Sequence, residues 1–226
     1  MRSIVLLSAG LDSSVNLHEA ARVSDVVLAL TFDYGQRAAK RELYFAKKLC
    51  RKLKIKHHSI DLKWMLDFGG SALIDRDLKV PTNEVRIDNL RISKQTAKSV
   101  WVPNRNGILL NIAAGYAESL NADWIIPGFN AEEAATFKDN SVGFIESLNE
   151  AFKFSTANAV KVKCFTSHLN KTEIIKRGLE LKINFENIWP CYFDALKPCQ
   201  QCESCKRFIR AAKLNHIATK WMKNEI

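Results

Sequence analysis

Short apolar runs alternate with helical patterns through the first two-thirds of the chain, and this alternation limits the fold more than any other feature. Strands of this length that alternate with helices form a parallel sheet with helices on both faces. The sequence therefore predicts an α/β fold built on a parallel sheet. We expect strands at residues 4–7, 26–32, 55–62 and 123–129, and helices at about 13–23, 38–53 and 107–120.

The middle and the end of the chain depart from this alternation. From about residue 63 to 102 the apolar spacing weakens, and the stretch contains two adjacent glycines and a proline. A connection of this length in an α/β domain is usually a lid, an interface or a mobile loop. Residues 203–222 have a helical, basic pattern. We therefore expect an α/β domain over residues 1–190, with an insertion at about 63–102, and a C-terminal segment over 191–226.

Charge and hydropathy narrow the function classes only in part. Lys and Arg number 34 against 24 Asp and Glu, which gives a net charge of +10. Such a surface attracts anions, and these could be nucleotides or nucleic acid. The chain has no apolar stretch of about 18 residues that could span a bilayer, and a strand pattern starts within three residues without a leader cleavage site. We therefore expect a cytoplasmic protein without a membrane partner.

The first strand pattern leads into a small polar turn within IVLLSAGLDSSVNL, residues 4–17. A strand-to-helix turn at the carboxyl end of a parallel strand directs backbone N–H groups and the positive end of the helix dipole at a ligand. Ala9 and Gly10 leave room for close approach, and three serines offer hydroxyl donors. Asp12 would repel a bare phosphate, so we expect it either to cap the helix or to hold Mg²⁺ beside a nucleotide. An ordinary strand–turn–helix remains the alternative.

Four of the six cysteines fall within fifteen residues near the end of the chain. They are spaced C-x7-C-x2-C-x2-C, at Cys191, Cys199, Cys202 and Cys205. Disulfides are rare in the cytosol, and four thiolates at short spacings can close a tetrahedral site around Zn²⁺. An iron–sulfur cluster is the alternative metal site. Because four protein ligands leave no open position, we expect a structural metal.

The N-terminal turn resembles the S-G-G-x-D-S signature of the PP-loop ATP pyrophosphatases, which grip the phosphates of ATP and transfer AMP to an oxygen of the substrate. The glycine patterns of P-loop and dinucleotide-binding proteins are absent. Ala9 stands where the signature has glycine, which is compatible if that residue has a negative φ. The residues that this resemblance implies for ATP binding are Leu7, Ser8, Ala9, Gly10, Leu11, Asp12, Ser13, Ser14, Val15, Asn16, Leu17, Asp33 and Tyr34.

The turn and the cysteine cluster together are a much narrower combination than either part. With both, the sequence resembles the 7-cyano-7-deazaguanine (preQ0) synthase family of queuosine biosynthesis. TFDYGQR at 31–37, followed by Glu42 and Leu43, resembles the F-D-Y-G-Q-R block of that family. VPNRN at 102–106 resembles its V-P-x-R-N block, and HLNKTEI at 168–174 its late lysine-containing segment. The resemblance covers essentially the whole chain.

The resemblance implies an ATP-dependent ligase that forms C–N bonds. It would convert 7-carboxy-7-deazaguanine and ammonia to 7-cyano-7-deazaguanine through adenylated intermediates, with ATP as substrate, Mg²⁺ and a structural Zn²⁺. We expect a homodimer and no nucleic-acid partner. The implied catalytic residues are Asp12, Ser13, Arg105 and Lys171, and the implied substrate-binding residues are Gln36, Arg105, Asn106 and Asn130.

One segment departs from the family pattern. After its G-x-N block the family commonly has an aromatic, serine, glycine and tyrosine run that ends in Asp-Cys-Arg, whereas this chain has AEEAATFKDNS at 131–141. Asp139, Asn140 and Ser141 can still bind a polar ligand, so the segment indicates either a subfamily with the same substrate or a relative with another one. Two alternatives stay open: a PP-loop enzyme that adenylates a tRNA base, and a non-enzymatic zinc-bearing module that binds nucleic acid.

Overall fold

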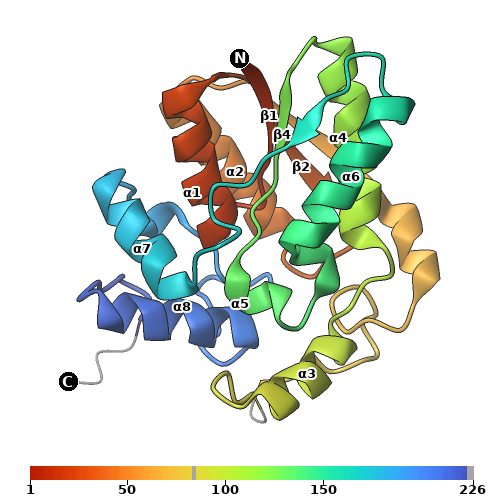
Figure 1. The fold of residues 1–226 in the computed structure, drawn as a ribbon. Helices are drawn as coiled ribbons and strands as arrows, with labels where there is room; N and C mark the ends of the chain where they lie inside the picture. The colour runs from red at the N-terminus through yellow and green to blue at the C-terminus, as the bar shows by residue number, and fades with distance from the viewer. Residues whose placement is uncertain (83–84, 223–226) are drawn as a thin grey trace.

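The computed structural model describes residues 1–82 and 85–222 of the chain. Within this part, five strands form one sheet in the order β3-β2-β1-β4-β5, and every neighbouring pair is parallel (Figure 1). The sheet confirms the predicted α/β fold. The strands are β1 Arg2–Leu6, β2 Asp25–Asp33, β3 His57–Asp61, β4 Trp124–Ile126 and β5 Lys161–Val162.

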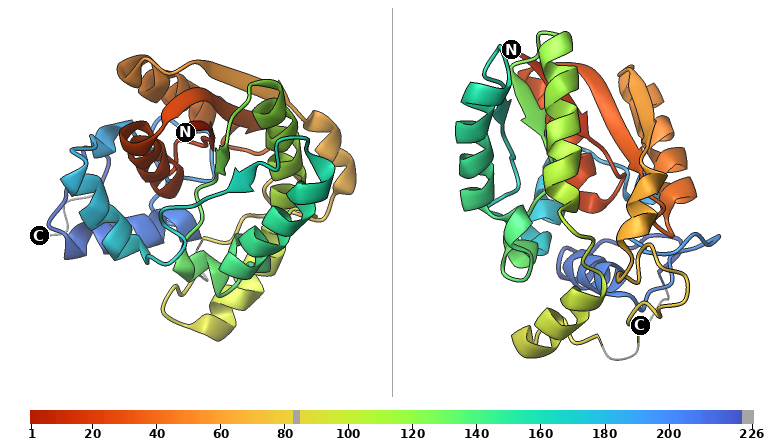
Figure 2. Two further views of the ribbon diagram at one scale, coloured as in Figure 1. Left: turned by 45° about the horizontal axis from the view of Figure 1, so that its top comes forward. Right: turned by 90° about the vertical axis from the view of Figure 1, so that its right-hand side faces the viewer.

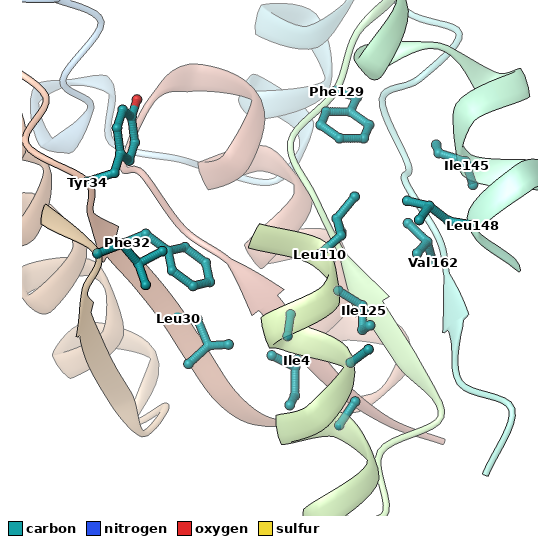
Figure 3. Close-up of a cluster of buried hydrophobic side chains, with 14 of the residues drawn as sticks. Ile4, Leu30, Phe32, Tyr34, Leu110, Ile125, Phe129, Ile145, Leu148 and Val162 are labelled. Atoms are coloured by element: carbon teal, nitrogen blue, oxygen red, sulfur yellow. The ribbon is translucent and has the colours of Figure 1, made fainter. Parts of the chain in front are cut away.

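Helices cover both faces of the sheet (Figure 2), because side chains alternate between the faces along each strand. Ile4 and Leu30 pack against two of the helices, in the cluster shown in Figure 3, whereas Val5 and Ala29 pack against the other two. The first pair of helices is α4 Arg105–Ser119 and α6 Val142–Ser155, and the second pair is α1 Leu11–Val23 and α2 Ala39–Leu53.

Two helices from the late part of the chain lie near the first helix, α1. Helix α7 (Lys171–Glu180) packs against both α1 and α8 (Glu203–Leu214), and the apolar side chains of the three helices form one cluster. Before α8, the Trp189 N–H donates a hydrogen bond of 2.9 Å to the Ala9 carbonyl. The early and late parts of the chain therefore meet at the turn between β1 and α1 (Figure 1).

The insertion predicted at about 63–102 has regular structure of its own. It contains the 3-10 helix η1 (Lys63–Phe68) and helix α3 (Leu90–Ser99). The Arg37 guanidinium donates hydrogen bonds of 2.6–2.8 Å to three carbonyl groups of the stretch between them. These contacts anchor the insertion beside the end of β2. Residues 83–84 of the insertion lie outside the described residues.

Several element boundaries differ from those predicted. The first helix begins at Leu11 rather than at residue 13, so more of the polar turn is helical. The strand expected at 123–129 ends at Ile126, and the C-terminal helix expected to reach residue 222 ends at Leu214. Residues 223–226 of the predicted C-terminal segment lie outside the described part of the chain.

Other elements were not expected. Strand β5 covers two residues, which is too short for a sequence signal. Helix α6 buries Ile145, Leu148 and Phe152, whose spacing of three and four is a helical pattern that could have indicated it. In the described residues, no helix is long and apolar enough to cross a membrane. The short helices are α5 Ala131–Ala134, η2 Lys138–Asn140 and η3 Phe185–Asn187.

Candidate active site

A cavity of about 250 Å³ lies at the carboxyl ends of β1, β2 and β4. This is the position at which open parallel sheets bind ligands. Tyr34 and Phe129, which lie toward the same end of the sheet in Figure 3, are part of its wall. Further walls come from the end of the insertion, the starts of α4 and α7, and the segment that leads into the cysteine cluster. Segments from the start, the middle and the end of the chain therefore meet at one site.

The turn between β1 and α1 forms the wall that the sequence predicts to hold phosphates. Gly10 is the N-cap of α1, and the hydroxyl oxygens of Ser8 and Ser13 lie 3.1 Å apart. About half of the predicted ATP-binding residues line the cavity. They are Leu7, Ser8, Gly10, Leu11, Asp12, Ser13 and Tyr34, whereas Ala9, Ser14, Val15, Asn16, Leu17 and Asp33 are not part of its wall.

The predicted ATP-binding residues outside the wall support the turn from behind or lie beside it. Val15 and Leu17 pack in two apolar clusters, and Asn16 is held by hydrogen bonds to the segment before α7. The Asp33 carboxylate accepts a hydrogen bond from the next turn and lies 3.5 Å from Lys63 Nζ. The contacts of these four residues are therefore with other protein groups, and none of the four lines the cavity.

Ala9 has a positive φ of 59°. The condition under which alanine would be harmless at this position, a negative φ, is therefore not met. The left-handed conformation costs a non-glycine residue about 1–2 kcal/mol. Ala9 is fully buried, and the hydrogen bond from Trp189 to its carbonyl helps to hold this conformation.

Gly128 lets the turn after β4 approach the turn after β1. A Cβ atom at residue 128 would lie 2.6 Å from the backbone nitrogen of Ser13 and 2.7 Å from its Cα. Both are backbone atoms, so neither can rotate out of the way. The sequence shows the glycine, but only the structure shows that it adjoins the turn between β1 and α1. We call this turn, which the sequence predicts to hold phosphates, the phosphate-type turn.

Gly128→Ala is therefore expected to lower the free energy of unfolding by about 1–3 kcal/mol, because the added methyl group must push the two turns apart. Gly115→Ala is the matched control, since a Cβ there meets nothing within 4 Å. Gly115 lies within α4, so its replacement should stabilise the protein by about 0.5–1 kcal/mol. Urea unfolding of both variants tests the prediction, and equal stabilities would contradict it.

Lys171, the first residue of α7, is buried between two carboxylates. Its Nζ lies 2.5 Å from Asp12 Oδ2 and 2.7 Å from Glu133 Oε1, and the residue is only 5% exposed. Burial acts to lower the pKa of Lys171, but the charges of the two carboxylates outweigh burial and raise it. The lysine is therefore a fixed positive charge in the cavity wall.

Asp12 does not cap α1, so the capping interpretation is wrong. Its Oδ2 accepts hydrogen bonds from Lys171 and, at 3.1 Å, from Asn130 Nδ2. Its Oδ1 is buried and has no hydrogen-bond partner among the described residues. Burial raises the pKa of Asp12 to about 6, against the opposing charge of Lys171. An orphaned carboxylate oxygen beside a phosphate-type turn fits a ligand of Mg²⁺.

Asn130 is fully buried and is not part of the cavity wall. Besides its bond to Asp12, its side-chain oxygen accepts the Glu133 N–H at 2.9 Å as the N-cap of α5. Asn130, which was predicted to bind substrate, therefore does not line the cavity itself but contacts Asp12, which does. The amide of Asn130 holds the carboxylate of Asp12 on one side and the backbone of Glu133 on the other.

Arg105 and Asn106 open α4 on another side of the cavity, as predicted. Arg105 Nη1 donates to the Tyr34 hydroxyl at 3.4 Å, and its guanidinium carbon lies 5.8 Å from the centre of that ring. Burial acts to lower the pKa of Arg105, but Tyr34 and Asp139 outweigh it and raise that pKa. Asn106 donates to the Asp139 carbonyl at 3.3 Å. This wall therefore presents a permanent cation.

Gln36 is held by its neighbours on the cavity wall. Its side-chain oxygen accepts the Tyr34 N–H at 2.9 Å, and its Nε2 donates to the Phe32 carbonyl at 2.9 Å and to Glu42 Oε2 at 2.8 Å. Glu42 also lines the cavity, although it was not predicted as a site residue. Its place just after the F-D-Y-G-Q-R block was the signal that could have found it.

An unpredicted buried ion network joins α8 to the start of α7. Glu132 accepts the backbone N–H of Lys171 at 2.9 Å, and its carboxylate lies 2.7 Å from Arg207 Nη1 and 2.6 Å from Arg210 Nη2. Arg207 also binds Glu203, one helical turn earlier, at 2.7 Å. Their spacing of four residues is visible in the sequence, but their partner on α5 is not. The network fixes the end of α7 that carries the buried lysine.

The four cysteines predicted as metal ligands come together. Their sulfur atoms all lie within 4.8 Å of one another, and only Cys199 is partly exposed. Four backbone N–H groups lie 3.3–3.5 Å from the sulfurs of Cys191 and Cys199, where they favour thiolates. Cys202 is the N-cap of α8, and Cys205 lies in its first turn. The cluster can hold a metal ion and would then fix the start of α8.

The strand order, the cavity at the carboxyl ends of the strands and the serine-containing turn define an α/β protein of the PP-loop type. A solved 4-thiouridine synthetase, in complex with RNA and bound ATP, has a similar fold, with a TM-score of 0.51 and 17% identity. The match covers 95% of this chain and 52% of that chain.

The chain belongs to the family of queuosine biosynthesis protein QueC, whose model matches residues 2–217. A relative from Bdellovibrio bacteriovorus is 54% identical over 98% of this chain and 97% of its own length. Another from Pelotomaculum thermopropionicum is 47% identical over 94% of this chain and 97% of its own length. Both relatives are named 7-cyano-7-deazaguanine synthase.

Proposed function

We propose that this chain is a 7-cyano-7-deazaguanine synthase, which uses ATP and ammonia to convert 7-carboxy-7-deazaguanine to the nitrile. The observation that carries this proposal is its 54% identity, over nearly its full length, to a relative of that name. The cavity is consistent with it, because Asp12 and Lys171 meet there beside a phosphate-type turn.

In this proposal the phosphates of ATP lie along the turn between Ser8 and Ser13. The N-terminus of α1, a helix of 13 residues, directs backbone N–H groups and a positive dipole end at them. Asp12, through its orphaned Oδ1, would hold Mg²⁺, which when bound neutralises phosphate charge. Tyr34 lines the cavity at the end of β2, where the adenosine would lie.

The proposed reaction needs positioning and charge rather than a nucleophile from the protein. A carboxylate oxygen of the base attacks the α-phosphorus of ATP, and pyrophosphate leaves. Ammonia attacks the acyl carbon, and AMP leaves to give the amide. A second ATP adenylates the amide oxygen, and loss of AMP gives the nitrile. Arg105 would orient the carboxylate of the base, and Lys171 would stabilise the negative charge on the α-phosphate group while it is transferred.

A pair of aromatic rings offers a platform for the base. Trp101 and Phe137 both line the cavity, with ring centres 6.1 Å apart and planes within 7° of parallel. Asp139 and Asn140 line it too, and can accept and donate hydrogen bonds at the edge of a planar base. Three of these four residues belong to the segment 131–141 that departs from the family pattern. We propose that this segment binds the same substrate with different side chains.

We propose Zn²⁺ as the metal of the cysteine cluster, with a structural role. Four cysteine ligands are a usual set for a structural zinc ion, and they leave no position open for substrate. When bound, the ion would connect Cys191 to the first turn of α8. Cys191 itself lines the cavity, so this connection also supports the wall.

We further propose that the protein acts in the cytoplasm as a homodimer. Trp64 and Phe68 of η1 support an interface, because they are 52% and 41% exposed and touch edge to face. Light scattering of the purified protein would give the mass in solution, and a monomer at micromolar concentration would contradict this assembly.

The alternative of tRNA thiolation has less support. Chemistry of that kind usually calls for a reactive cysteine, and only Cys50 and Cys164 lie outside the cluster. Burial raises the pKa of Cys50 to about 12 and also raises that of Cys164. Neither residue is therefore a ready source of thiolate.

The experiment that tests the function combines the purified protein with ATP, Mg²⁺, ammonium and 7-carboxy-7-deazaguanine. We expect release of AMP and pyrophosphate that depends on the base, and formation of the nitrile detected by mass spectrometry. If AMP formed only with tRNA, the proposed substrate would be wrong, but the proposed adenylation chemistry would stand. No AMP with either, from folded and metal-loaded protein, would favour a binding module.

A further inference from the structure

We propose that Glu42 is the base that removes a proton from ammonium inside the cavity, so that the attacking species is free ammonia. This inference rests on the proposed synthase function. At neutral pH ammonia in solution is mostly ammonium, whose nitrogen has no lone pair. An enzyme that uses it as a nucleophile therefore benefits from a group near the reacting carbon that takes one proton.

Most carboxylates on the cavity wall are already engaged by cations. Among the described residues, five carboxylates line the cavity. Asp12 and Glu133 share Lys171, and Glu203 binds Arg207. A carboxylate held by a permanent cation is a poor proton acceptor, because the cation favours its charged form. Only Glu42 and Asp139 have no cation within 4 Å in the described part of the chain.

Glu42 is the better acceptor of these two. Burial raises the pKa of Asp139, and the first influence that opposes burial there is the positive charge of Arg105. Glu42 Oε2 accepts a hydrogen bond from the neutral amide of Gln36 at 2.8 Å, and this bond, ahead of the charge of Arg105, is the first influence that opposes burial there. No described residue donates a hydrogen bond to the second oxygen of Glu42. One oxygen is thus held in place while the other is open to a small cation.

The surroundings of Glu42 suit a group that gains and loses a proton near neutral pH. Burial raises its pKa to about 7, while the Gln36 hydrogen bond and the charge of Arg105 act to lower the pKa and the charge of Asp33 acts to raise it. Tyr34 is a further titratable group that interacts electrostatically with Glu42. Gln36 is itself held by hydrogen bonds to the end of β2, so the carboxylate has a fixed position.

The proton balance of the step is complete. The Glu42 carboxylate takes one proton from NH4⁺ and becomes a carboxylic acid, which leaves NH3. The nitrogen lone pair forms a bond to the acyl carbon, and the C–O bond to AMP breaks with its electron pair on the phosphate oxygen. The amide nitrogen, now positively charged, loses its extra proton to solvent. Glu42 returns its own proton to solvent before the next cycle.

Glu42→Gln tests this role, because glutamine can still accept the hydrogen bond from Gln36 but is not a base. With ammonium at pH 7 we expect the amide-forming rate to fall by about 10²–10⁴-fold. The residual rate should rise with pH as free ammonia becomes abundant. Hydroxylamine, which is largely neutral at pH 7, should still trap the acyl-adenylate as a hydroxamate at nearly the rate of the unchanged protein. Glu146→Gln, at an exposed position on α6, is the matched control.

Several outcomes would overturn the assignment. An equal loss with ammonium and hydroxylamine would mean that Glu42 serves ATP or base binding, or the fold. An unchanged ammonium rate and pH profile would mean that it has no role in proton transfer. The proposed function has its own readout, because the unchanged protein must release pyrophosphate when the base is added. Failure there would remove the proposed function, and this inference with it.

Discussion

Replacing Lys171 with methionine is expected to lower the rate of pyrophosphate release by about 10²–10³-fold, the usual effect of removing one group that stabilises developing charge. The same change should lower the free energy of unfolding by about 3–5 kcal/mol. Both effects have one cause, since the ammonium group lies 2.5 Å from Asp12 and 2.7 Å from Glu133 in a buried site. Without it, the buried carboxylate of Asp12 and the partly buried carboxylate of Glu133 face each other unpaired.

Single-turnover assays with ATP and the base would measure the first effect, and urea unfolding the second. Lys176→Met is the matched control, because Lys176 lies on the same helix but is exposed. It should leave both quantities nearly unchanged. If Lys171→Met kept its rate, Lys171 would be only a structural charge. If it kept its stability, one of the two carboxylates would have to be protonated in the folded protein.

Loss of the metal is the second change for which we expect a large effect. Structural zinc sites have apparent binding free energies of about 10–16 kcal/mol at pH 7, which is comparable with the whole stability of a domain, about 5–15 kcal/mol. We therefore expect Cys202→Ser, or incubation with a strong chelator, to release the metal and to unfold at least α8. Cys202 is the N-cap of that helix, and the helix carries Arg207, so the ion network would be lost with it.

Elemental analysis should find one zinc per chain in the unchanged protein and much less in Cys202→Ser. The fluorescence of Trp189, which packs in the cysteine cluster, would report the local structure. Cys164→Ser is a matched control outside the cluster and should keep its zinc. Iron with a visible absorption band would identify an iron–sulfur cluster instead. A metal-free protein with unchanged Trp189 fluorescence would show that packing alone holds this region.

The features that could be predicted from the sequence are those that depend on residues near one another in the chain. The apolar runs of β1 and β2 predict buried strands, since each is a continuous local pattern. The metal cluster is predicted because three of its four ligands lie within Cys199–Cys205. The wall residues Arg105 and Lys171 came from short blocks that resemble a family, and both lie on the cavity.

The features that could not be predicted depend on contacts between distant segments. The positive φ of Ala9 is accompanied by a hydrogen bond from Trp189, and no local pattern around Ala9 reports it. Asn130 follows its strand as expected, but its amide turns inward to Asp12 because it also caps α5. Glu132 looks like an ordinary helix residue until the fold brings Arg207 beside it.

The meeting of early and late segments at the turn after β1 has a consequence for the protein during its synthesis. The turn emerges from the ribosome well before Trp189, which donates the hydrogen bond to Ala9, and before the cavity-lining Arg207. A growing chain can pair β1 with β2 long before its cavity has all its walls. We therefore expect nascent chains to acquire affinity for the proposed nucleotide only after α8 has been synthesised.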